Sequence, residues 1–273
     1  MKVKSSIAIA LALCALAGCK KDKGPKQTEV DLRPGDRRPV SGSDADAGTG
    51  GTDPDVVPDA PKVLARTTLA GVPAPMGAPV VDLEPLAIKV GDDAIGAFTT
   101  PPTGEGAFVW GDAIAEAVAK AAPGTSVVIA ASADTSFTML EVAAQGAATA
   151  ARPELHLRVA GPGSDTTLLA CAPIVGSCRG QALAAPGAGD FKLTLMPGHA
   201  ASLAAFVSDK PGTMLGPLDA ASLGKALQDL AAGSTAVVHL RAEAGVTAQD
   251  LVDALSIDGG ARKLVFVLGA AAQ

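Results

Sequence analysis

The chain has 273 residues, a formal net charge of -6 and 48% hydrophobic residues. An acidic chain of this kind lacks the surplus of cations that releases counterions from phosphates, so its charge argues against nucleic acid as a partner. With one Trp and no Tyr, the chain also has little material for aromatic platforms that stack on flat ligands.

Residues 1–18 have the pattern of a signal peptide. A positively charged start is followed by an apolar run over residues 7–15, which is too short to serve as a permanent membrane-spanning helix. The run ends in Leu16-Ala17-Gly18-Cys19, which resembles the lipobox of bacterial lipoproteins. The resemblance implies a diacylglycerol, with acyl chains such as palmitate, on the sulfur of Cys19. We therefore expect a lipid-anchored protein of the cell envelope that faces the periplasm, on either the inner or the outer membrane.

Residues 19–80 are predicted to form a tether between the lipid and the folded part of the chain. They are dense in Pro, Gly, Asp and Ser and bury too little apolar surface to offset the entropy of ordering a backbone. After the tether, apolar runs at residues 86–90 and 94–98 flank Gly91-Asp92-Asp93, a pattern that predicts a β-hairpin. Trp110 lies just before the first predicted helix and is expected to pack on that helix's own core as a hydrophobic staple.

The central feature of the sequence is an internal repeat, in which residues 112–160 align with residues 221–269 at a constant offset of 109 and without a gap. Both copies have helical spacing, then strand spacing, then a Thr that is expected to cap a second helix, then a last strand. These N-cap residues are Thr138 and Thr247. The paired apolar positions are Ile114, Ala117, Val118 and Ala121 with Leu223, Ala226, Leu227 and Leu230; Val127–Ile129 with Ala236–Val238; Met139, Val142, Ala143 and Gly146 with Ala248, Leu251, Val252 and Leu255; and Leu155, Leu157 and Val159 with Leu264, Phe266 and Leu268.

The second copy is also preceded by two apolar runs, at residues 191–196 and 203–207. Each unit therefore predicts the order β-β-α-β-α-β, with its helices on one face of its sheet. We expect an α+β protein made of two small tandem domains, residues 81–161 and 191–273, joined by a connection over residues 162–190.

The cysteines agree with export from the cytoplasm. In this interpretation Cys14 leaves with the signal peptide and Cys19 carries the lipid, so Cys171 and Cys178 remain as a pair in an oxidising compartment. We predict a disulfide between them, which would stabilise the fold by about 2–3 kcal/mol on the chain-entropy model.

The first copy resembles the periplasmic domain of the ExbD/TolR biopolymer-transport family. The residues that carry the resemblance are the strand Val127–Ile129, then Asp134, Phe137, Thr138 and Val142, and the last strand over residues 155–159. Thr138 stands where the family has Gly, and the second copy departs further. The resemblance implies an envelope domain that self-associates or binds the cell wall or envelope partners. Family members also carry a transmembrane helix with a proton-coupling Asp, a segment that this sequence does not show after its signal peptide.

Chemical sites are weakly indicated. His156, His199 and His239 are scattered, and His199 follows a Pro-Gly turn between two predicted strands. The Cys pair has the wrong spacing for a zinc chelate, and a disulfide would use both thiols. Glycine-rich phosphate loops, nucleophile elbows and a caspase-like Cys-His arrangement are not indicated. We therefore predict no catalytic residues, no metal and no cofactor.

Four residues are candidates for an interaction surface. Asp134 and Phe137 precede or begin the second helix of the first copy, where Asp134 is expected either to cap that helix or to contact a ligand. Val265 and Val267 make the last strand of the second copy apolar on both faces. The additional apolar face must be covered by the first copy, by a second protomer or by a partner.

The function predicted from these patterns is a non-enzymatic binding or assembly module, anchored in the envelope through its lipid. Its candidate partners are an envelope protein, peptidoglycan or a second copy of the chain, with a link to ExbD/TolR-type transport or cell-wall contact. The alternatives are a periplasmic enzyme whose site lies between the two repeats and a structural spacer. A cleft with converging polar groups near the repeat junction would favour the enzyme, and a flat or apolar sheet face would favour the binding module.

Overall fold

The computed structural model describes residues 62–98, 107–121, 123–207, 209–233, 235–257 and 264–269. The predicted signal peptide, Cys19 and the tether up to residue 61 lie outside these residues. The described part is a mixed α/β arrangement with four helices and one large sheet.

The elements follow the same order, β-β-β-α-β-α-β, in the two halves of the described chain, which is one strand more in each half than the predicted β-β-α-β-α-β. The first half contains β1 (Val80–Glu84), β2 (Ala87–Val90), β3 (Asp93–Ala97), α1 (Val109–Ala121), β4 (Ser126–Ala131), α2 (Phe137–Thr149) and β5 (Glu154–Ala160). The connection contains β6 (Asp165–Cys171), β7 (Gly176–Cys178) and β8 (Gln181–Leu183). The second half contains β9 (Phe191–Met196), β10 (Ala200–Val207), β11 (Lys210–Leu218), α3 (Ala220–Gly233), β12 (Ala236–Ala242), α4 (Ala248–Ile257) and β13 (Leu264–Leu268).

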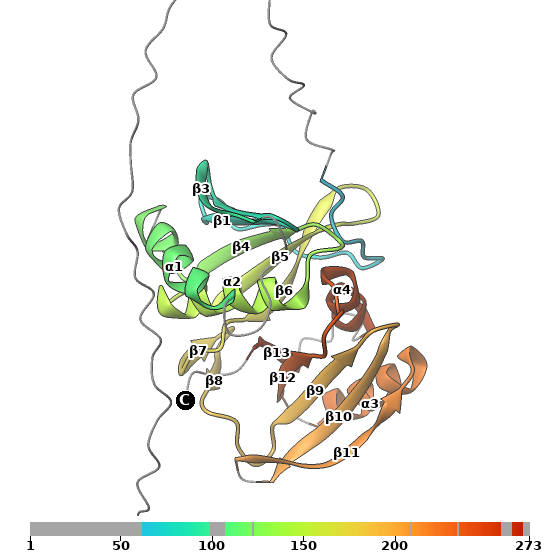
Figure 1. Cartoon of the computed structure of the whole chain (residues 1–273). Coiled ribbons are helices and arrows are strands. Elements are labelled where there is room, and N and C mark those ends of the chain that lie inside the picture. Colours follow the sequence, from blue (N-terminus) through green and yellow to red (C-terminus); the bar gives the residue numbers. More distant parts are fainter. Residues whose placement is uncertain are drawn as a thin grey trace, which may run out of the picture. The chain divides into compact units, whose positions relative to one another are not determined.

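Eleven of the described strands form a single sheet in the order β11-β10-β9-β12-β13-β6-β5-β4-β1-β2-β3 (Figure 1). The prediction of a separate sheet in each half is therefore wrong. Strand β6 of the connection lies between the halves, antiparallel to β5 along its length and parallel to β13 at the pair Val267 and Cys171. Without β6, the facing edges of β5 and β13 would expose unpaired backbone groups. That need explains why a strand occupies the connection.

Within this sheet the two halves have the same strand pairing. Strands β4 and β5 are parallel with Val127 opposite Leu155, and β12 and β13 are parallel with Ala236 opposite Leu264. Both residues of the second pair lie 109 positions after those of the first. Strand β1 also runs parallel to β4, as β9 does to β12, and β2–β3 and β10–β11 extend the sheet outwards as antiparallel strands. Residues that lie 109 positions apart in the sequence therefore hold equivalent positions in the paired strands of the two halves.

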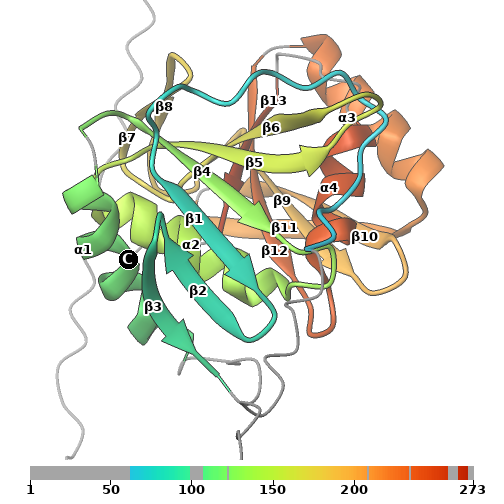
Figure 2. The same ribbon diagram turned by 90° about the horizontal axis from the view of Figure 1, so that it is seen from above.

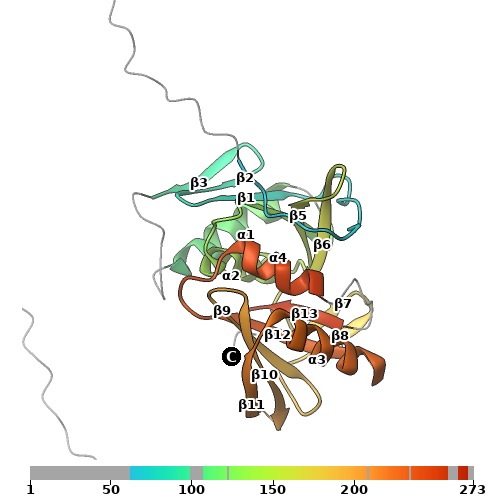
Figure 3. The same cartoon turned by 90° about the vertical axis from the view of Figure 1, so that its right-hand side faces the viewer.

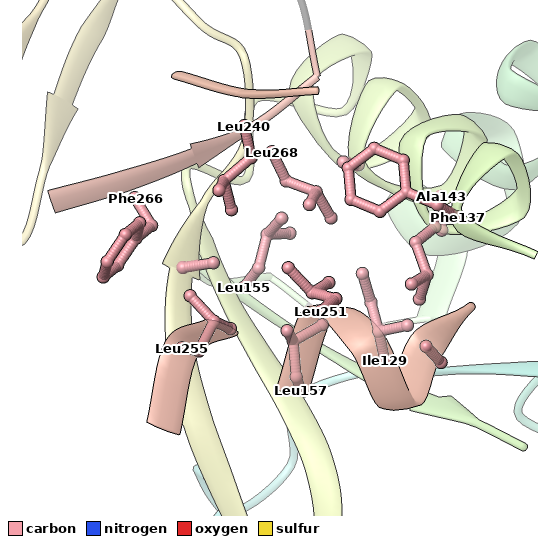
Figure 4. Close-up of a cluster of buried hydrophobic side chains, with 14 of the residues drawn as sticks. Ile129, Phe137, Ala143, Leu155, Leu157, Leu240, Leu251, Leu255, Phe266 and Leu268 are labelled. Carbon is pink, nitrogen blue, oxygen red and sulfur yellow. The ribbon is translucent and has the colours of Figure 1, made fainter. Parts of the chain in front are cut away.

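Helices from both halves share one hydrophobic core. Figure 3 shows α1, α2 and α4 between a layer of first-half strands and a layer of second-half strands, an arrangement that follows from the twist of a long sheet. Figure 4 shows the centre of this core, where Ile129 and Leu155 of the first half meet Leu251, Phe266 and Leu268 of the second. All five side chains are buried. Truncating a buried Leu in such a core costs about 2–5 kcal/mol.

The loops that begin α2 and α4 are bonded to each other. The Phe137 N–H donates to the Val246 carbonyl at 2.9 Å, and the Ala248 N–H donates to the Thr135 carbonyl at 2.8 Å. Backbone donors at the two helix starts are therefore satisfied by the opposite half, which locks the halves together at this point.

The two predicted N-caps have different outcomes. The Thr247 hydroxyl accepts the Asp250 N–H at 3.4 Å, and the Asp250 carboxylate accepts the Thr247 N–H at 2.8 Å. This reciprocal pattern is a capping box, so the prediction for Thr247 is confirmed. The prediction for Thr138 is wrong, because α2 begins two residues earlier than a cap at Thr138 would require, and its N-cap is Ser136, whose side chain makes no capping hydrogen bond.

Trp110 connects its helix to the first hairpin of the sheet. Helix α1 begins at Val109, earlier than expected, so Trp110 lies in its first turn. Its ring meets Phe98 edge to face, with ring centroids 5.1 Å apart. A Cβ at Gly96 would lie 2.9 Å from the ring, so Gly is required on β3 for this close approach. Trp110 thus fastens α1 to the β2–β3 hairpin, in place of the staple predicted from the sequence.

Residues 62–72, called the strap below, were predicted to belong to the tether but are bonded to the sheet, so that prediction is wrong for this stretch. The strap makes isolated bridges from Leu64 to Ser132, from Arg66 to Ala160 and from Val72 to Thr167. Figure 2 shows it in blue, running from α4 around to β1. At its start, the Lys62 ammonium group is paired with Asp82. These contacts fix the strap on the first half of the fold and on β6 of the connection.

Candidate functional site

The predicted disulfide is confirmed. Cys171, the last residue of β6, is bonded to Cys178 of β7, with their Cα atoms 6.1 Å apart. Both residues are buried, and the bond holds the β7–β8 hairpin against the second half of the sheet.

This hairpin covers the face that was predicted to be an interaction surface. Val265 and Val267 are 3% and 2% exposed and form a small buried cluster with Val237, Leu183 and the disulfide. Their apolar face is thus covered by the connection of the same chain. Val265 and Val267 do not present a surface to a partner, and their prediction as interface residues is wrong.

Asp134 and Phe137 are not brought together on a surface. Phe137 is 3% exposed and points into the shared core, so its prediction as an interface residue is also wrong. Asp134 lies exposed in the turn between β4 and α2. The expected capping of α2 is not seen, since the helix starts after Ser136 without a side-chain cap.

A polar network that was not predicted from the sequence gathers around the first turns of α4. At its centre is His199, in the turn between β9 and β10. Its Nδ1 atom lies 3.4 Å from Asp250 Oδ1 and 3.3 Å from Asp253 Oδ2. The imidazole nitrogen thus sits between two carboxylate oxygens that come from one face of α4. The predicted turn at His199 is confirmed.

Each carboxylate is held in place by its other oxygen. Asp250 Oδ2 accepts hydrogen bonds from the Thr247 N–H at 2.8 Å and from the Thr247 hydroxyl at 2.9 Å. Asp253 Oδ1 accepts a hydrogen bond from Gln249 Nε2 at 2.8 Å. Because these bonds fix the carboxyl groups, Oδ1 of Asp250 and Oδ2 of Asp253 are the oxygens that face outwards to His199.

The strap completes the network. Gln249 Oε1 accepts the Arg66 N–H at 2.8 Å, and its Nε2 donates to the Arg66 carbonyl at 3.0 Å. Thr67 and Ser256 share a hydrogen bond between hydroxyl oxygens 2.8 Å apart. The Gln249 side chain therefore bonds to both backbone groups of Arg66, as the backbone of a neighbouring strand would. The same side chain also orients Asp253.

Two hollows flank α4, and Asp253 lines both. The larger, of about 780 Å³, lies at the junction of the two halves, where the strap and the end of β5 meet α4. The smaller, of about 270 Å³, lies beside His199 between α4, α3 and the β9–β10 turn. The larger is lined by Arg66, Thr67, Thr68, Ala160, Gly161, Gln249, Asp253 and Ser256, and the smaller by Leu195, Met196, His199, Ala200, Ala201, Ala220, Leu223, Asp250, Asp253 and Ala254.

The contacts limit the chemistry of this region. The hydroxyl groups of Thr67 and Ser256 bond to each other, whereas the ion-pair contacts of His199 go to Asp250 and Asp253. A hydroxyl nucleophile activated by His199 would need a direct hydrogen bond between the two, and no such bond is present among the residues described. Nor do the described ranges contain a group of three His, Cys, Asp or Glu side chains placed to hold a metal ion.

The other two histidines are buried in the sheet. Burial lowers the pKa of His156 and of His239, because the charged imidazolium loses its hydration. His156 Nδ1 lies 3.3 Å from the Thr167 hydroxyl. His239 packs against the Phe206 ring, and its Nε2 is 3.6 Å from Asp190 Oδ2, beyond hydrogen-bond distance. Both environments favour the neutral imidazole, and both histidines are part of the packed sheet.

Comparison of the chain with models of known protein families, with curated proteins and with solved structures finds no match. Among the helices described, none combines the length and apolar character that would let it cross a membrane. A role for the α4 region must therefore be inferred from the geometry of its own residues.

Proposed function

We propose that the chain is a lipid-anchored envelope protein that acts as a non-enzymatic binding module, with the surface around α4 as its ligand-binding region. The anchor is supported by the order of the segments, a charged start, an apolar run and the Leu16-Ala17-Gly18-Cys19 motif. The disulfide between Cys171 and Cys178 fits the oxidising compartment to which such a signal leads.

The observation that carries the binding role is the prearranged polar network at the repeat junction. Binding sites are concave and use a few fixed polar groups to orient a ligand. Here Gln249, Asp250 and Asp253 project from two successive turns of α4, and each is held by a hydrogen bond to the strap, the helix cap or a neighbour. Because the network is ordered without a ligand, little additional entropy is lost when one binds.

The enzyme remains the second candidate, because the larger hollow does lie at the repeat junction and is lined by polar groups. The binding role is preferred because the groups that would do chemistry are paired with one another. The Thr67 and Ser256 hydroxyls form their own pair, and His199 is paired with two carboxylates.

The resemblance to the ExbD/TolR periplasmic domain motivates the class of partner. It rests on Val127–Ile129, Asp134, Phe137, Thr138, Val142 and the strand over residues 155–159. It favours cell-wall contact or an envelope assembly over a free metabolite. If a search finds no such partner, a homodimer and a spacer role are the remaining possibilities.

The anchor is tested by metabolic labelling with a palmitate analogue and by membrane fractionation. The full chain should incorporate label and sediment with membranes, whereas Cys19→Ala should lose both properties. Cys14→Ala is the matched control and should keep them, since Cys14 precedes the predicted cleavage site. Equal labelling of the two variants would overturn the proposed anchor.

The binding region is tested by photo-cross-linking in cells. A photoreactive residue at Thr68, which is exposed and lines the larger hollow, should cross-link to peptidoglycan or to a defined envelope protein. The same residue at Lys225, exposed on α3, is the control. The cross-link should be specific to position 68 and should disappear in the Cys19→Ala background. Identical products from both positions, or none from Thr68, would overturn the assignment of the α4 surface.

A further inference from the structure

The His199 nitrogen marks a position prepared for a cation. Its Nδ1 lies at almost equal distances, 3.4 and 3.3 Å, from Asp250 Oδ1 and Asp253 Oδ2. Asp250 is the more buried of the two carboxyl groups, with 14% of its side chain exposed, against 41% for Asp253. Two partly desolvated carboxylate oxygens that converge on one point attract an N–H donor, and a positively charged donor more than a neutral one.

The hollow beside this position is apolar. Apart from His199 and the two carboxylates, its lining consists of Leu, Met and Ala side chains from β9, β10, α3 and α4. Its volume of about 270 Å³ is slightly below the range of about 300–1,000 Å³ for whole ligand sites. It therefore suits a group of side-chain size that is apolar along its stem and positively charged at one end.

We propose that this hollow binds an organic cation, an ammonium group on an alkyl stem as in a lysine side chain, which replaces His199 between the two carboxylates. The ammonium would donate to Asp250 Oδ1 and Asp253 Oδ2, and the stem would lie against Leu195, Leu223 and Ala254. This inference rests on the proposed function, because it names the class of ligand for the same surface. The negative charge of the chain as a whole also attracts such a ligand.

His199 is suited to give up its place. Its side chain is 60% exposed, and it lies in a short turn with a φ of 63°. An ammonium group has three donors, so it can serve both carboxylates while His199 moves into water. The imidazole thus acts as an internal stand-in that occupies the position between the two carboxylates until a ligand arrives.

The experiment is an NMR titration of the purified full chain in detergent micelles. The probe is Nα-acetyl-lysine amide, and the neutral control is Nα-acetyl-norleucine amide, which has the same four-carbon stem without the ammonium group. The lysine compound should shift the signals of Ala200, Leu223 and Ala254, and the norleucine compound should bind about tenfold more weakly, the equivalent of one charge-assisted hydrogen bond at a partly exposed site. Equal binding of the two compounds, or no shift with either, would overturn the proposal.

Variants then locate the cation. Asp253→Asn should weaken binding of the lysine compound about tenfold, and the matched control Asp229→Asn, on the exposed face of α3, should not change it. His199→Ala should strengthen binding several-fold because no side chain has to be displaced. Loss of binding in His199→Ala, or equal effects of the two Asn variants, would contradict the displacement model.

The titration and the tests of the proposed function can fail separately. Cross-linking from Thr68 without any binding of the lysine compound would overturn this inference alone. Binding of the lysine compound by a chain that is not lipidated and gives no envelope cross-link would overturn the proposed envelope role alone.

Discussion

Helices α2 and α4 hold equivalent places in the two halves, yet one is a core element and the other carries the polar network. At the offset of 109, the polar α4 residues that line the two hollows correspond to core or inter-half positions of α2. The pairs are Gln249 with Leu140, Asp250 with Glu141, Asp253 with Ala144 and Ser256 with Ala147. Leu140, Ala144 and Ala147 are buried, whereas all four α4 residues are partly exposed.

Glu141 illustrates how the same kind of residue is used differently. It pairs with Arg241 of β12, with Oε1 3.3 Å from the guanidinium, and so joins the two halves. Burial raises its pKa, and the neighbouring Arg241 opposes that shift. The equivalent Asp250 instead caps its own helix and faces His199. The comparison shows that two equivalent helices take different roles because different segments of the chain cover them. Helix α2 is enclosed between the halves, and one face of α4 is left to the strap and to solvent.

The largest expected effect comes from exchanging residues between the two helices. Leu140→Gln should lower the free energy of unfolding by about 4 kcal/mol, because it removes a buried side chain and introduces an amide with few partners. The reciprocal Gln249→Leu should change it by less than about 1 kcal/mol, since the freed Arg66 backbone is exposed and can bond to water. Urea unfolding measures both. Similar losses in the two variants would mean that α2 and α4 are equally central.

An intermediate effect is expected from the buried histidines as pH is lowered. The folded-state pKa values of His156 and His239 lie below the ordinary value of 6.5, so the unfolded chain takes up these protons first. Stability should therefore be complete above pH 6.5 and decrease as pH falls through the lowered values, by up to about 1.4 kcal/mol per pH unit for each group.

The same measurement compares the two halves. His239→Leu should flatten the fall in stability below pH 6.5 by the contribution of the second half, and His156→Leu by that of the first. Thermal unfolding followed between pH 8 and pH 5 would show this. An unchanged slope in either variant would mean that the histidine concerned is not held neutral by burial.

The smallest effect is expected at the helix starts. Thr247→Ala should cost about 1 kcal/mol, because it removes the hydroxyl of the capping box. The equivalent Thr138→Ala should change stability by less than about 0.5 kcal/mol, because Thr138 lies inside α2 and does not cap it. Equal losses in the two variants, measured by urea unfolding, would contradict the assigned difference between the caps.

Much of the local structure could be predicted from the sequence. The repeat at an offset of 109 predicted the places of α2, β4 and β5 and of α4, β12 and β13, because the spacing of apolar residues reports which side of an element is buried. The disulfide between Cys171 and Cys178 was predicted because no other cysteine remained to compete. The spacing of apolar residues reflects neighbours a few positions apart, and the helices and strands that it predicts are present in the fold.

The candidate site could be predicted only in parts. Thr247 was recognised as a cap and His199 as a turn residue, and the Thr-x-x-Asp spacing from Thr247 to Asp250 was available as a capping-box signal. Their meeting was not foreseen. It depends on β9 pairing with β12, which places the β9–β10 turn beside the start of α4, and on a strap that is far away in the sequence.

By itself, the sequence determined the four helices, the strands β4, β5, β12 and β13 that follow them, the duplication and the cysteine pair, since each of these depends on neighbours along the chain. Strands β1, β6, β7, β8 and β11 were not predicted. Only the tertiary structure decided that β6 would join the halves into one sheet, that the β7–β8 hairpin would cover Val265 and Val267, and that α4 would keep a polar face. The physical reason is that these outcomes arise from satisfying strand edges and covering apolar faces. Those requirements can be met by any segment that reaches them, so they are resolved in three dimensions.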